Sequence, residues 1–286
     1  MKTLNWRMLR ILDRNLGPFL RKRILTRFPG SIRVNGEEIT DLGPLGYRTP
    51  GRTRAGRISM IGSWRGSKVK IYTAHNVQHA KFRIALNDFC AGNICFPEVV
   101  LSQGELIVER WIDGSSVSSL DSAGRESAAQ RVNAFLVGKM SSGFVPGSVG
   151  SMTAGFCYFH DYLLARIGPW IYWDDVGGFV ASWRDHYQDV KDEIPDRLSH
   201  PDLSASNMVE ESGSGKLYMI DNELLGMGPS WILDYRNSFV GKYDYPEPVE
   251  SEAVRRFIER SWQLRQLSKA LGLGEFSRAK SLLSST

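Results

Sequence analysis

The hydrophobic pattern of this chain changes character at Gly114, and that change constrains the fold more than any other feature. Before Gly114, short runs rich in β-branched and aromatic residues are separated by turn residues, and such runs predict strands. The expected elements are strands over 57–64, 68–73, 98–101 and 105–111 and one helix over 77–91. The first third of the chain is therefore predicted to be a strand-rich lobe with a single helix.

After Gly114 the apolar residues recur with helical spacing. The expected elements are helices over 127–140, 155–166, 178–190 and from about 250 onward, and a hairpin of strands over 208–210 and 216–220. The pattern predicts an α+β fold of two lobes, a β-rich N-lobe over 41–113 and a larger helical C-lobe over 114–286. A crevice between two lobes is the natural place for a ligand.

The N-terminal segment is basic, and Asp13 is its only acid before residue 34. Apolar residues between 4 and 28 have helical spacing with a break at Gly17-Pro18, so residues 1–40 are expected to form a basic amphipathic helical extension. Such an extension either packs on its own domain or, through residues 1–30, contacts an anionic membrane surface. No apolar run reaches the length of a membrane span, and the expected location is cytoplasmic, possibly peripheral to the membrane.

Asp202, Asn207 and Asp221 carry the chemistry that the sequence indicates. Transfer of a phosphoryl group requires metal ions that neutralise phosphate charge and one carboxylate that orients the attacking hydroxyl and accepts its proton. Magnesium prefers oxygen ligands and usually takes one or two carboxylates from the protein. Asp202 is therefore predicted to be the base, and Asn207 and Asp221 the metal ligands.

Two neighbours of these residues have open roles. His200 is predicted to brace the loop through hydrogen bonds rather than to act in catalysis. Glu223, two residues after Asp221, is either a further metal ligand or a surface charge.

The order of these residues resembles the catalytic and metal-binding segments of the aminoglycoside phosphotransferase and choline kinase group: His200, Asp202 and Asn207, then Asp221 and Glu223 after a hairpin. This resemblance implies a protein-kinase-like fold with ATP and Mg²⁺ as cofactors. It also implies that Asp234, in the segment 228–234, braces the catalytic loop. The matching segments, taken in order, cover roughly residues 51–234.

The resemblance extends to the N-lobe. Lys70 lies on a strand similar to the one that bears the phosphate-contacting lysine, and Lys68 points to the same face of that strand. Lys70 is the favoured candidate, because Lys68 is nearer the turn. The segment 106–114 is similar to the strand and hinge that receive adenine through backbone groups, which implies nucleotide contacts at Val108, Glu109, Arg110 and Trp111.

The chain departs from the group in two places. Members usually pair the strand lysine with a glutamate on the first helix, but residues 76–97 contain no glutamate. Asp88 is the only acid there, and it is either the partner of Lys70 or an exposed helix charge. The loop over 51–56 lacks the expected glycine-rich pattern, although backbone N–H groups and arginines can also hold phosphates.

The cysteines and the aromatic residues of the C-lobe have plainer interpretations. Cys90, Cys95 and Cys157 show no metal-binding spacing and are expected to be buried thiols. The aromatic cluster over 170–187 is expected to pack in the core. Because the resembled enzymes place their acceptor site near this region, Asp174, Asp175 and Asp185 are also candidates for binding a cationic or polyhydroxyl substrate.

The sequence thus predicts an ATP- and Mg²⁺-dependent phosphotransferase acting on a hydroxyl of a small molecule. Sugars, amino alcohols, aminoglycosides and lipid-linked glycans are the acceptor classes considered. The alternative is a non-catalytic nucleotide-binding protein or scaffold on the same fold, which the missing helix glutamate favours. Nucleic acid is not an expected partner, because the chain shows no nucleic-acid-binding motif.

Overall fold

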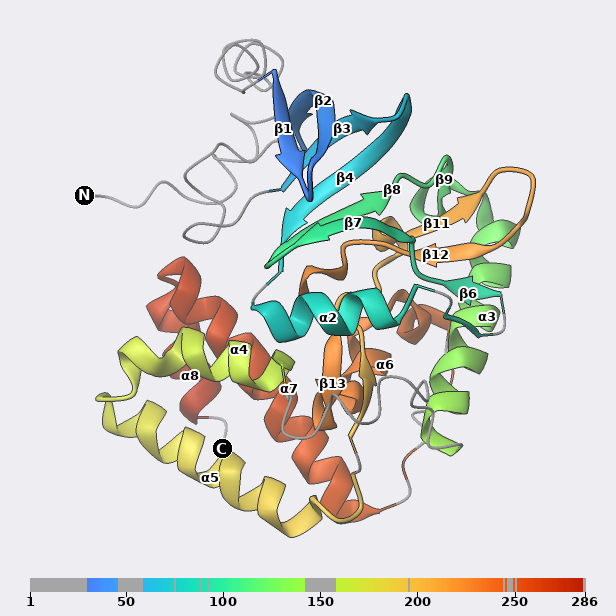
Figure 1. The fold of residues 1–286 in the computed structure, drawn as a ribbon. Helices are drawn as coiled ribbons and strands as arrows, with labels where there is room; N and C mark the ends of the chain where they lie inside the picture. Colours follow the sequence, from blue (N-terminus) through green and yellow to red (C-terminus); the bar gives the residue numbers. More distant parts are fainter. Residues whose placement is uncertain are drawn as a thin grey trace.

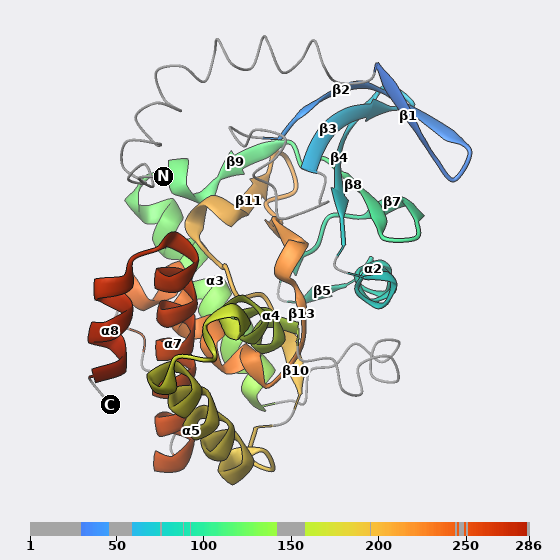
Figure 2. The same cartoon turned by 90° about the vertical axis from the view of Figure 1, so that its left-hand side faces the viewer.

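The structure is a computed structural model that describes residues 30–45, 59–74, 76–87, 89–91, 93–141, 158–194, 196–243, 245, 249 and 251–284. Its upper part in Figure 1 is a curled antiparallel sheet, and its lower part is mainly helical. In Figure 2 the same sheet curves over the top of the molecule, with α5, α7 and α8 grouped below it. The predicted two-lobed α+β architecture is therefore confirmed.

Six strands form the N-lobe sheet in the order β1-β2-β3-β4-β8-β7. Their bounds are β1 Ser31–Val34, β2 Glu37–Pro44, β3 Ser59–Trp64, β4 Ser67–Thr73, β7 Val99–Gln103 and β8 Leu106–Arg110. Strands β3 and β4 form the predicted hairpin, and β8 pairs with β4 so that Glu109 lies opposite Lys70. This register places the strand that was predicted to reach adenine directly beside the strand of the candidate lysine.

The sheet begins earlier in the chain than the sequence predicted. Residues 31–40 were assigned to the helical extension, but they form β1 and most of β2. The reason is local: Asn35 and Gly36 both have positive φ values, 52° and 83°, as the two-residue turn of a tight hairpin requires. The N-lobe thus includes residues from Ser31 onward, and residues 1–29 of the predicted extension lie outside the described part of the chain.

One helix, α2, packs beneath the N-lobe sheet. It spans Val77–Ala85, and Asn76 caps it by accepting a 2.7 Å hydrogen bond from the N–H of His79. Ala80 packs with Tyr72, Val99 and Ile107 of the sheet. The predicted helix was too long at its C-terminal end, because Cys90–Ala91 forms a short strand, β5, that pairs with β6 at Ile94–Cys95.

This pairing also overturns the prediction for two of the cysteines. Cys90 and Cys95 stand directly opposite each other on β5 and β6, with their Cα atoms 4.3 Å apart, and they are joined by a disulfide. The sequence interpretation considered only their spacing and missed the cross-strand register. Cys157 lies outside the described residues.

A second sheet carries the catalytic hairpin. Its strand order is β5-β6-β12-β11-β9, with β9 at Gly114–Ser116, β11 at Met208–Glu211 and β12 at Leu217–Met219. Gly114 is the point where the chain leaves the N-lobe, and there β9 runs so close to β11 that a Cβ atom would overlap the carbonyl oxygen of Glu210. Only glycine permits this approach, so the change of pattern at Gly114 coincides with a steric requirement.

The helices of the C-lobe enclose the rest of the core. They are α3 Ser122–Ser141, α4 Tyr158–Ile167, α5 Asp174–Val190, α6 Asp234–Asn237, α7 Glu252–Leu273 and α8 Phe276–Ser284. A small sheet is formed by β10 Arg197–Ser199 and β13 Gly226–Gly228. Short 3₁₀ turns occur at 117–119, 168–170, 205–207, 222–224, 229–233 and 239–243. Phe179, Trp183 and Phe257 pack together between α5 and α7, as the core interpretation of the aromatic cluster predicted. Tyr172 is the exception, because it is 70% exposed. Within the described ranges, none of the helices is both long and apolar enough to cross a bilayer.

Candidate active site

The candidate catalytic loop is held from below by Asp234, the first residue of α6. Its two carboxylate oxygens accept hydrogen bonds from the hydroxyl of Ser199 and from the N–H of His200, both at 3.0 Å. Asp234 is fully buried, so these bonds act where water does not compete. The predicted bracing of the loop by this aspartate is therefore confirmed.

His200 anchors the other side of the loop. Its ring is 2% exposed, and its Nε2 lies 3.1 Å from the carbonyl oxygen of Ile220. Burial lowers the pKa of His200, because the charged imidazolium is poorly solvated, although the charge of Asp234 opposes this effect. A neutral ring that donates to Ile220 links the two candidate segments, which agrees with the structural role predicted for His200.

Asn207 and Asp221 lie side by side because they flank one hairpin. Asn207 immediately precedes β11, Asp221 follows β12 by one residue, and the N–H of Ile220 donates to the carbonyl oxygen of Asn207 at 2.9 Å. The side-chain amide of Asn207 donates to the backbone carbonyl of Asp202 at 3.0 Å. The structure thus brings the three predicted residues Asp202, Asn207 and Asp221 into one site.

The backbone of Asp221 adopts a left-handed conformation, with φ 63° and ψ 48°. Residues other than glycine rarely adopt this conformation, and it persists only where the surrounding structure enforces it. Here it occurs at a residue predicted to bind metal, in a loop that a hairpin and a buried histidine hold in place. The conformation keeps the Asp221 carboxylate about half exposed, with 48% of the side chain accessible.

Lys70 reaches this carboxylate from the other lobe. Its Nζ atom lies 3.5 Å from Oδ1 of Asp221, and its side chain is 10% exposed. Lys68 points to the same face of β4, but its Nζ lies 3.7 Å from the centre of the Trp111 ring at the surface. The geometry therefore supports the choice of Lys70 over Lys68. The Lys70 side chain covers the candidate site from the side of the N-lobe.

The chemistry of this donor set fits a magnesium ion. Because the amide nitrogen of Asn207 is used by the loop, its side-chain oxygen is the atom left to coordinate a cation, and the Asp221 carboxylate supplies a second oxygen. Among the described residues, no group of three or more His, Cys, Asp or Glu side chains forms a metal site. Magnesium usually takes one or two carboxylates from a protein and keeps water and phosphate oxygens as its other ligands. The side chain of Glu223 lies outside the described part, so its role stays a prediction.

A buried ion pair occupies the position where the sequence left the lysine without a helix partner. Arg83 of α2 donates from Nε to Oε1 of Glu109 at 2.8 Å, and the two side chains are 0% and 2% exposed. Tyr72 donates its hydroxyl to the same oxygen at 2.7 Å, and Arg83 also donates to the carbonyl of Pro97. The helix α2 thus contributes the basic member of a buried ion pair, and the strand β8 contributes the acid. Asp88, which the sequence left as either the partner of Lys70 or an exposed helix charge, lies outside the described residues.

This network extends to the metal segment through Asn222, the residue after Asp221. The amide of Asn222 lies 3.5 Å from Oε1 of Glu109 and 3.2 Å from the carbonyl oxygen of Met219. Sequence reasoning missed Arg83, because its partner Glu109 comes from a strand 26 residues later in the chain.

The structure also narrows how the segment from Val108 to Trp111 can contact adenine. The N–H groups of Arg110 and Trp111 already donate to the carbonyls of Glu98 and Lys68, at 2.8 and 3.1 Å. The side chain of Val108 is buried in the core of the sheet, and that of Glu109 is buried in the ion pair. The N–H groups of Arg110 and Trp111 are therefore already used within the protein, and the assignment of these four residues to adenine stays a prediction.

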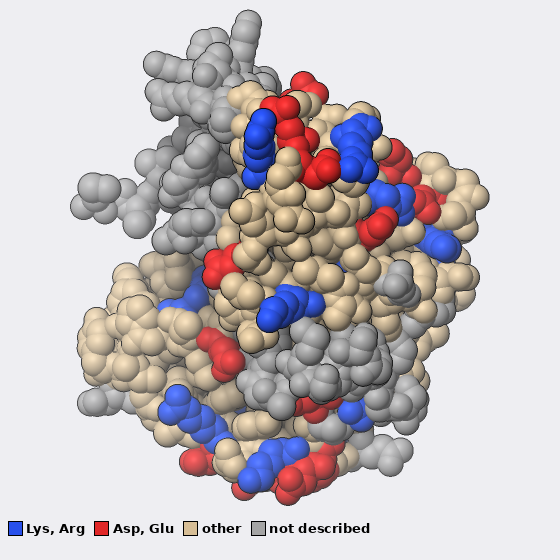
Figure 3. Space-filling view, in the orientation of Figure 1, with Lys and Arg blue, Asp and Glu red and all other residues tan. Residues whose placement is uncertain are grey.

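Charge on the surface is mixed. Figure 3 shows acidic and basic side chains of the described residues interspersed over the N-lobe. Asp175 and Asp185, two of the predicted substrate-binding acids, are exposed on α5, which lies at the far end of the C-lobe from the N-lobe sheet in both ribbon views (Figures 1 and 2). The side chain of Asp174 lies outside the described part. The assignment of Asp174, Asp175 and Asp185 to acceptor binding stays a prediction.

Comparisons with solved structures identify the fold. A thermostable mutant of aminoglycoside phosphotransferase APH(4)-Ia matches with a TM-score of 0.53 and 18% identity, over 86% of this chain and 92% of that one. Choline kinase LicA from Streptococcus pneumoniae matches with a TM-score of 0.52 and 16% identity, over 98% and 100% of the two chains. Spectinomycin phosphotransferase APH(9)-Ia matches with a TM-score of 0.51 and 11% identity, over 92% and 96%.

No protein-family profile and no curated protein matches the sequence. At these identities the structural matches establish architecture, and they agree with the resemblance of the sequence motifs. The chain therefore has the two-lobed, protein-kinase-like fold seen in aminoglycoside phosphotransferases and choline kinase.

Proposed function

We propose that this protein transfers the γ-phosphoryl group of ATP to a hydroxyl group of a small molecule in a magnesium-dependent reaction. The observation that carries the proposal is the approach of Lys70 to Asp221 across the two lobes, at 3.5 Å. This approach brings a cation for phosphate and an oxygen ligand for metal into a single site, and the Asp202 carboxylate lies on the adjoining loop. Phosphoryl transfer depends mainly on such positioning and charge compensation.

Each residue has a defined part in this reaction. Asp202 would orient the acceptor hydroxyl and take its proton as the oxygen bonds to the γ-phosphorus and the bond to the leaving ADP oxygen breaks. Asn207 and Asp221, with Glu223 as a further candidate, would hold magnesium, which when bound neutralises phosphate charge. Lys70 would act as a point charge on the phosphate oxygens.

Solved structures of similar fold support the choice of ligands. One structure of APH(4)-Ia is a ternary complex with ADP and hygromycin B, and another holds AMP-PNP and hygromycin B. That of APH(9)-Ia is a complex with ADP and spectinomycin. The site of Lys70, Asp202 and Asp221 in the present chain is accordingly proposed to hold ATP together with a hydroxyl-bearing acceptor.

The alternative is a nucleotide-binding protein that does not catalyse transfer. The observation in its favour is that α2 offers no glutamate to Lys70 and instead carries Arg83, which pairs with Glu109 of β8. The Asp202 loop argues against it, because its hydrogen bonds to Asn207 and Asp234 keep the candidate base in place. The predicted contact of residues 1–30 with an anionic membrane surface also stays a prediction, since residues 1–29 lie outside the described part.

An acceptor screen tests the proposal. ADP formation is measured with ATP and Mg²⁺ in the presence of sugars, amino alcohols, aminoglycosides and glycans, and products are identified by mass. We expect at least one class to give ADP and phosphorylated acceptor in equal amounts, and Lys70→Met to lower that turnover strongly because the phosphates lose their cation. Lys280→Met, on exposed α8, is the control. Magnesium-dependent ATP binding without turnover of any acceptor would instead support the non-catalytic alternative.

A further inference from the structure

Two half-buried arginines lie on the contacting helices α4 and α7 and have no role in the chemistry described so far, and one of them, Arg265, contacts the candidate catalytic loop. Arg265 of α7 donates from Nη1 to the carbonyl oxygen of Pro201 at 2.8 Å, which places its guanidinium one residue from Asp202. Its central carbon lies 5.6 Å from the Phe159 ring and 5.8 Å from the Trp262 ring. Two aromatic faces and one carbonyl therefore fix this positive charge next to the candidate base.

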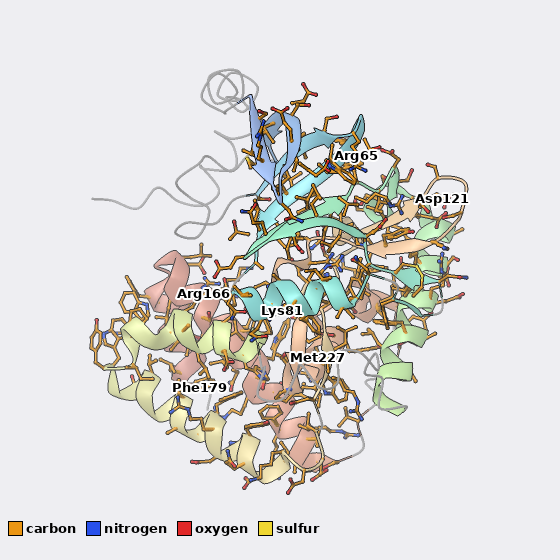
Figure 4. All side chains as sticks on the ribbon, viewed as in Figure 1. Arg65, Lys81, Asp121, Arg166, Phe179 and Met227 are labelled. Atoms are coloured by element: carbon orange, nitrogen blue, oxygen red, sulfur yellow. A yellow bond between two sulfur atoms is a disulfide. The ribbon has the colours of Figure 1, made fainter. Side chains whose placement is uncertain are left out.

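The second arginine comes from the neighbouring helix. Arg166 of α4 donates from Nη1 to the hydroxyl of Tyr162 at 3.2 Å, and its guanidinium lies over the Tyr162 ring. It also rests on Gly272 of α7, where any side chain would overlap it. Phe159, Tyr162 and Arg166 share one face of α4, and this face lies against the face of α7 that carries Arg265 and Gly272. Figure 4 shows Arg166 between α4 and α8, toward the N-lobe.

The charge of this pair is incompletely compensated. Of the residues whose side chains the structure describes, no carboxylate forms a salt bridge with either arginine, whereas Arg83, Arg110 and Arg236 each have one. Asp202 is the acid that acts most strongly on Arg265, followed by Asp234, which is already engaged by Ser199 and His200. Burial lowers the pKa of Arg265, so its charged form is desolvated. A desolvated cation without a full partner favours binding of an anion.

We infer that Tyr162, Arg166 and Arg265 form an acceptor subsite for an anionic group, so that the hydroxyl compound presented to Asp202 carries a phosphate or a carboxylate. The assignment of this subsite to an acceptor rests on the proposed function. The binding of an anion at these residues does not depend on it. Guanidinium groups suit phosphate and carboxylate because they donate paired hydrogen bonds in a fixed plane. Polycationic acceptors would be repelled by the same pair.

A binding experiment tests the subsite without relying on turnover. Inorganic phosphate is titrated against the wild-type protein, Arg166→Gln, Lys70→Met and the control Arg256→Gln, and the shift of the thermal unfolding midpoint is recorded. Arg256 is an exposed arginine on the same helix as Arg265. We expect Arg166→Gln to weaken phosphate binding roughly tenfold, because a charge-assisted contact is lost. Arg256→Gln is expected to leave it unchanged, whereas Lys70→Met, which removes the candidate cation for the nucleotide phosphates, shows whether the measured phosphate is bound there instead.

The possible results distinguish the anionic subsite from the proposed enzymatic function. No stabilisation of the wild-type protein by phosphate, or stabilisation that is lost in Lys70→Met but kept in Arg166→Gln, would overturn the anionic subsite.

Turnover is then compared across a neutral sugar, its phosphate ester and its amino derivative. The phosphate ester is expected to have the highest kcat/KM, and Arg166→Gln should raise its KM without changing kcat. Preference for the amino derivative would also overturn the inference. Phosphate binding without any turnover would leave the subsite in place and reject only the proposed enzymatic function.

Discussion

Replacing Asp202 by asparagine is expected to lower the rate of phosphoryl transfer by roughly 10²–10⁴-fold while leaving ATP binding intact. The amide cannot accept the hydroxyl proton, yet it matches the carboxylate in shape. The loop should keep its structure, because Asn207 donates to the backbone carbonyl of Asp202 and not to its side chain. Arg265 likewise binds the loop through the Pro201 carbonyl. The measurement is the single-turnover rate with ATP, magnesium and the best acceptor of the screen.

Ser206→Ala is the matched control for this variant. Ser206 is exposed on the same loop, and its hydroxyl contacts only that of Ser204 within the part of the chain that the structure describes. Its loss should leave the rate within about twofold of the wild-type value, in line with small effects at surface positions. An unchanged rate in Asp202→Asn would show that another group accepts the proton.

Replacing Arg83 by methionine is expected to destabilise the protein by about 3–5 kcal/mol. Among the described residues, the change leaves the carboxylate of Glu109 in the core with only the Tyr72 hydroxyl and the more distant Asn222 amide as partners. Burying a charge without its ion partner is among the costliest changes a core can undergo. Urea unfolding followed by circular dichroism measures the loss.

Two further variants show that the effect comes from the pair. Lys81→Met changes an exposed residue of the same helix, labelled in Figure 4, and is expected to alter the free energy of unfolding by less than about 0.5 kcal/mol. Arg83→Met combined with Glu109→Leu removes both charges and should recover most of the loss, because an apolar pair of similar volume tolerates burial. A loss in Arg83→Met no larger than that of Lys81→Met would contradict the account of the network.

The catalytic segment was predictable because its information is local. Asp202, Asn207 and Asp221 lie within twenty residues, on a loop and a hairpin whose turn residues are evident in the sequence. The alternation of a strand likewise predicted that Lys68 and Lys70 share a face, and β4 bears this out. What the pattern could not give was the partner of each lysine, since Trp111 and Asp221 come from distant segments.

The errors share one physical cause, which is pairing between segments that the local pattern treats separately. The helix over 77–91 was extended too far because its last residues pair with β6 instead, and the same pairing joins Cys90 to Cys95. Glu109 was assigned to a segment that contacts adenine through backbone groups, and the pattern gave no sign that its side chain pairs with Arg83, which lies 26 residues earlier in the chain. Arg166 and Arg265 were not singled out, because only the packing of α4 on α7 brings them near the catalytic loop.

The central claim, that Asp221 and Lys70 form a nucleotide and magnesium site between the lobes, is tested most directly by the metal dependence of ATP binding. The free energy of unfolding is compared with and without ATP, in magnesium and in excess chelator, for the wild-type protein, Asp221→Asn and the exposed control Asp192→Asn. At ATP concentrations about 100-fold above Kd, we expect roughly 2.7 kcal/mol of stabilisation in magnesium for the wild-type and control proteins. Most of this stabilisation should be lost in chelator and in Asp221→Asn. Stabilisation by ATP that is equal in all three proteins, or absent from all of them, would contradict the claim.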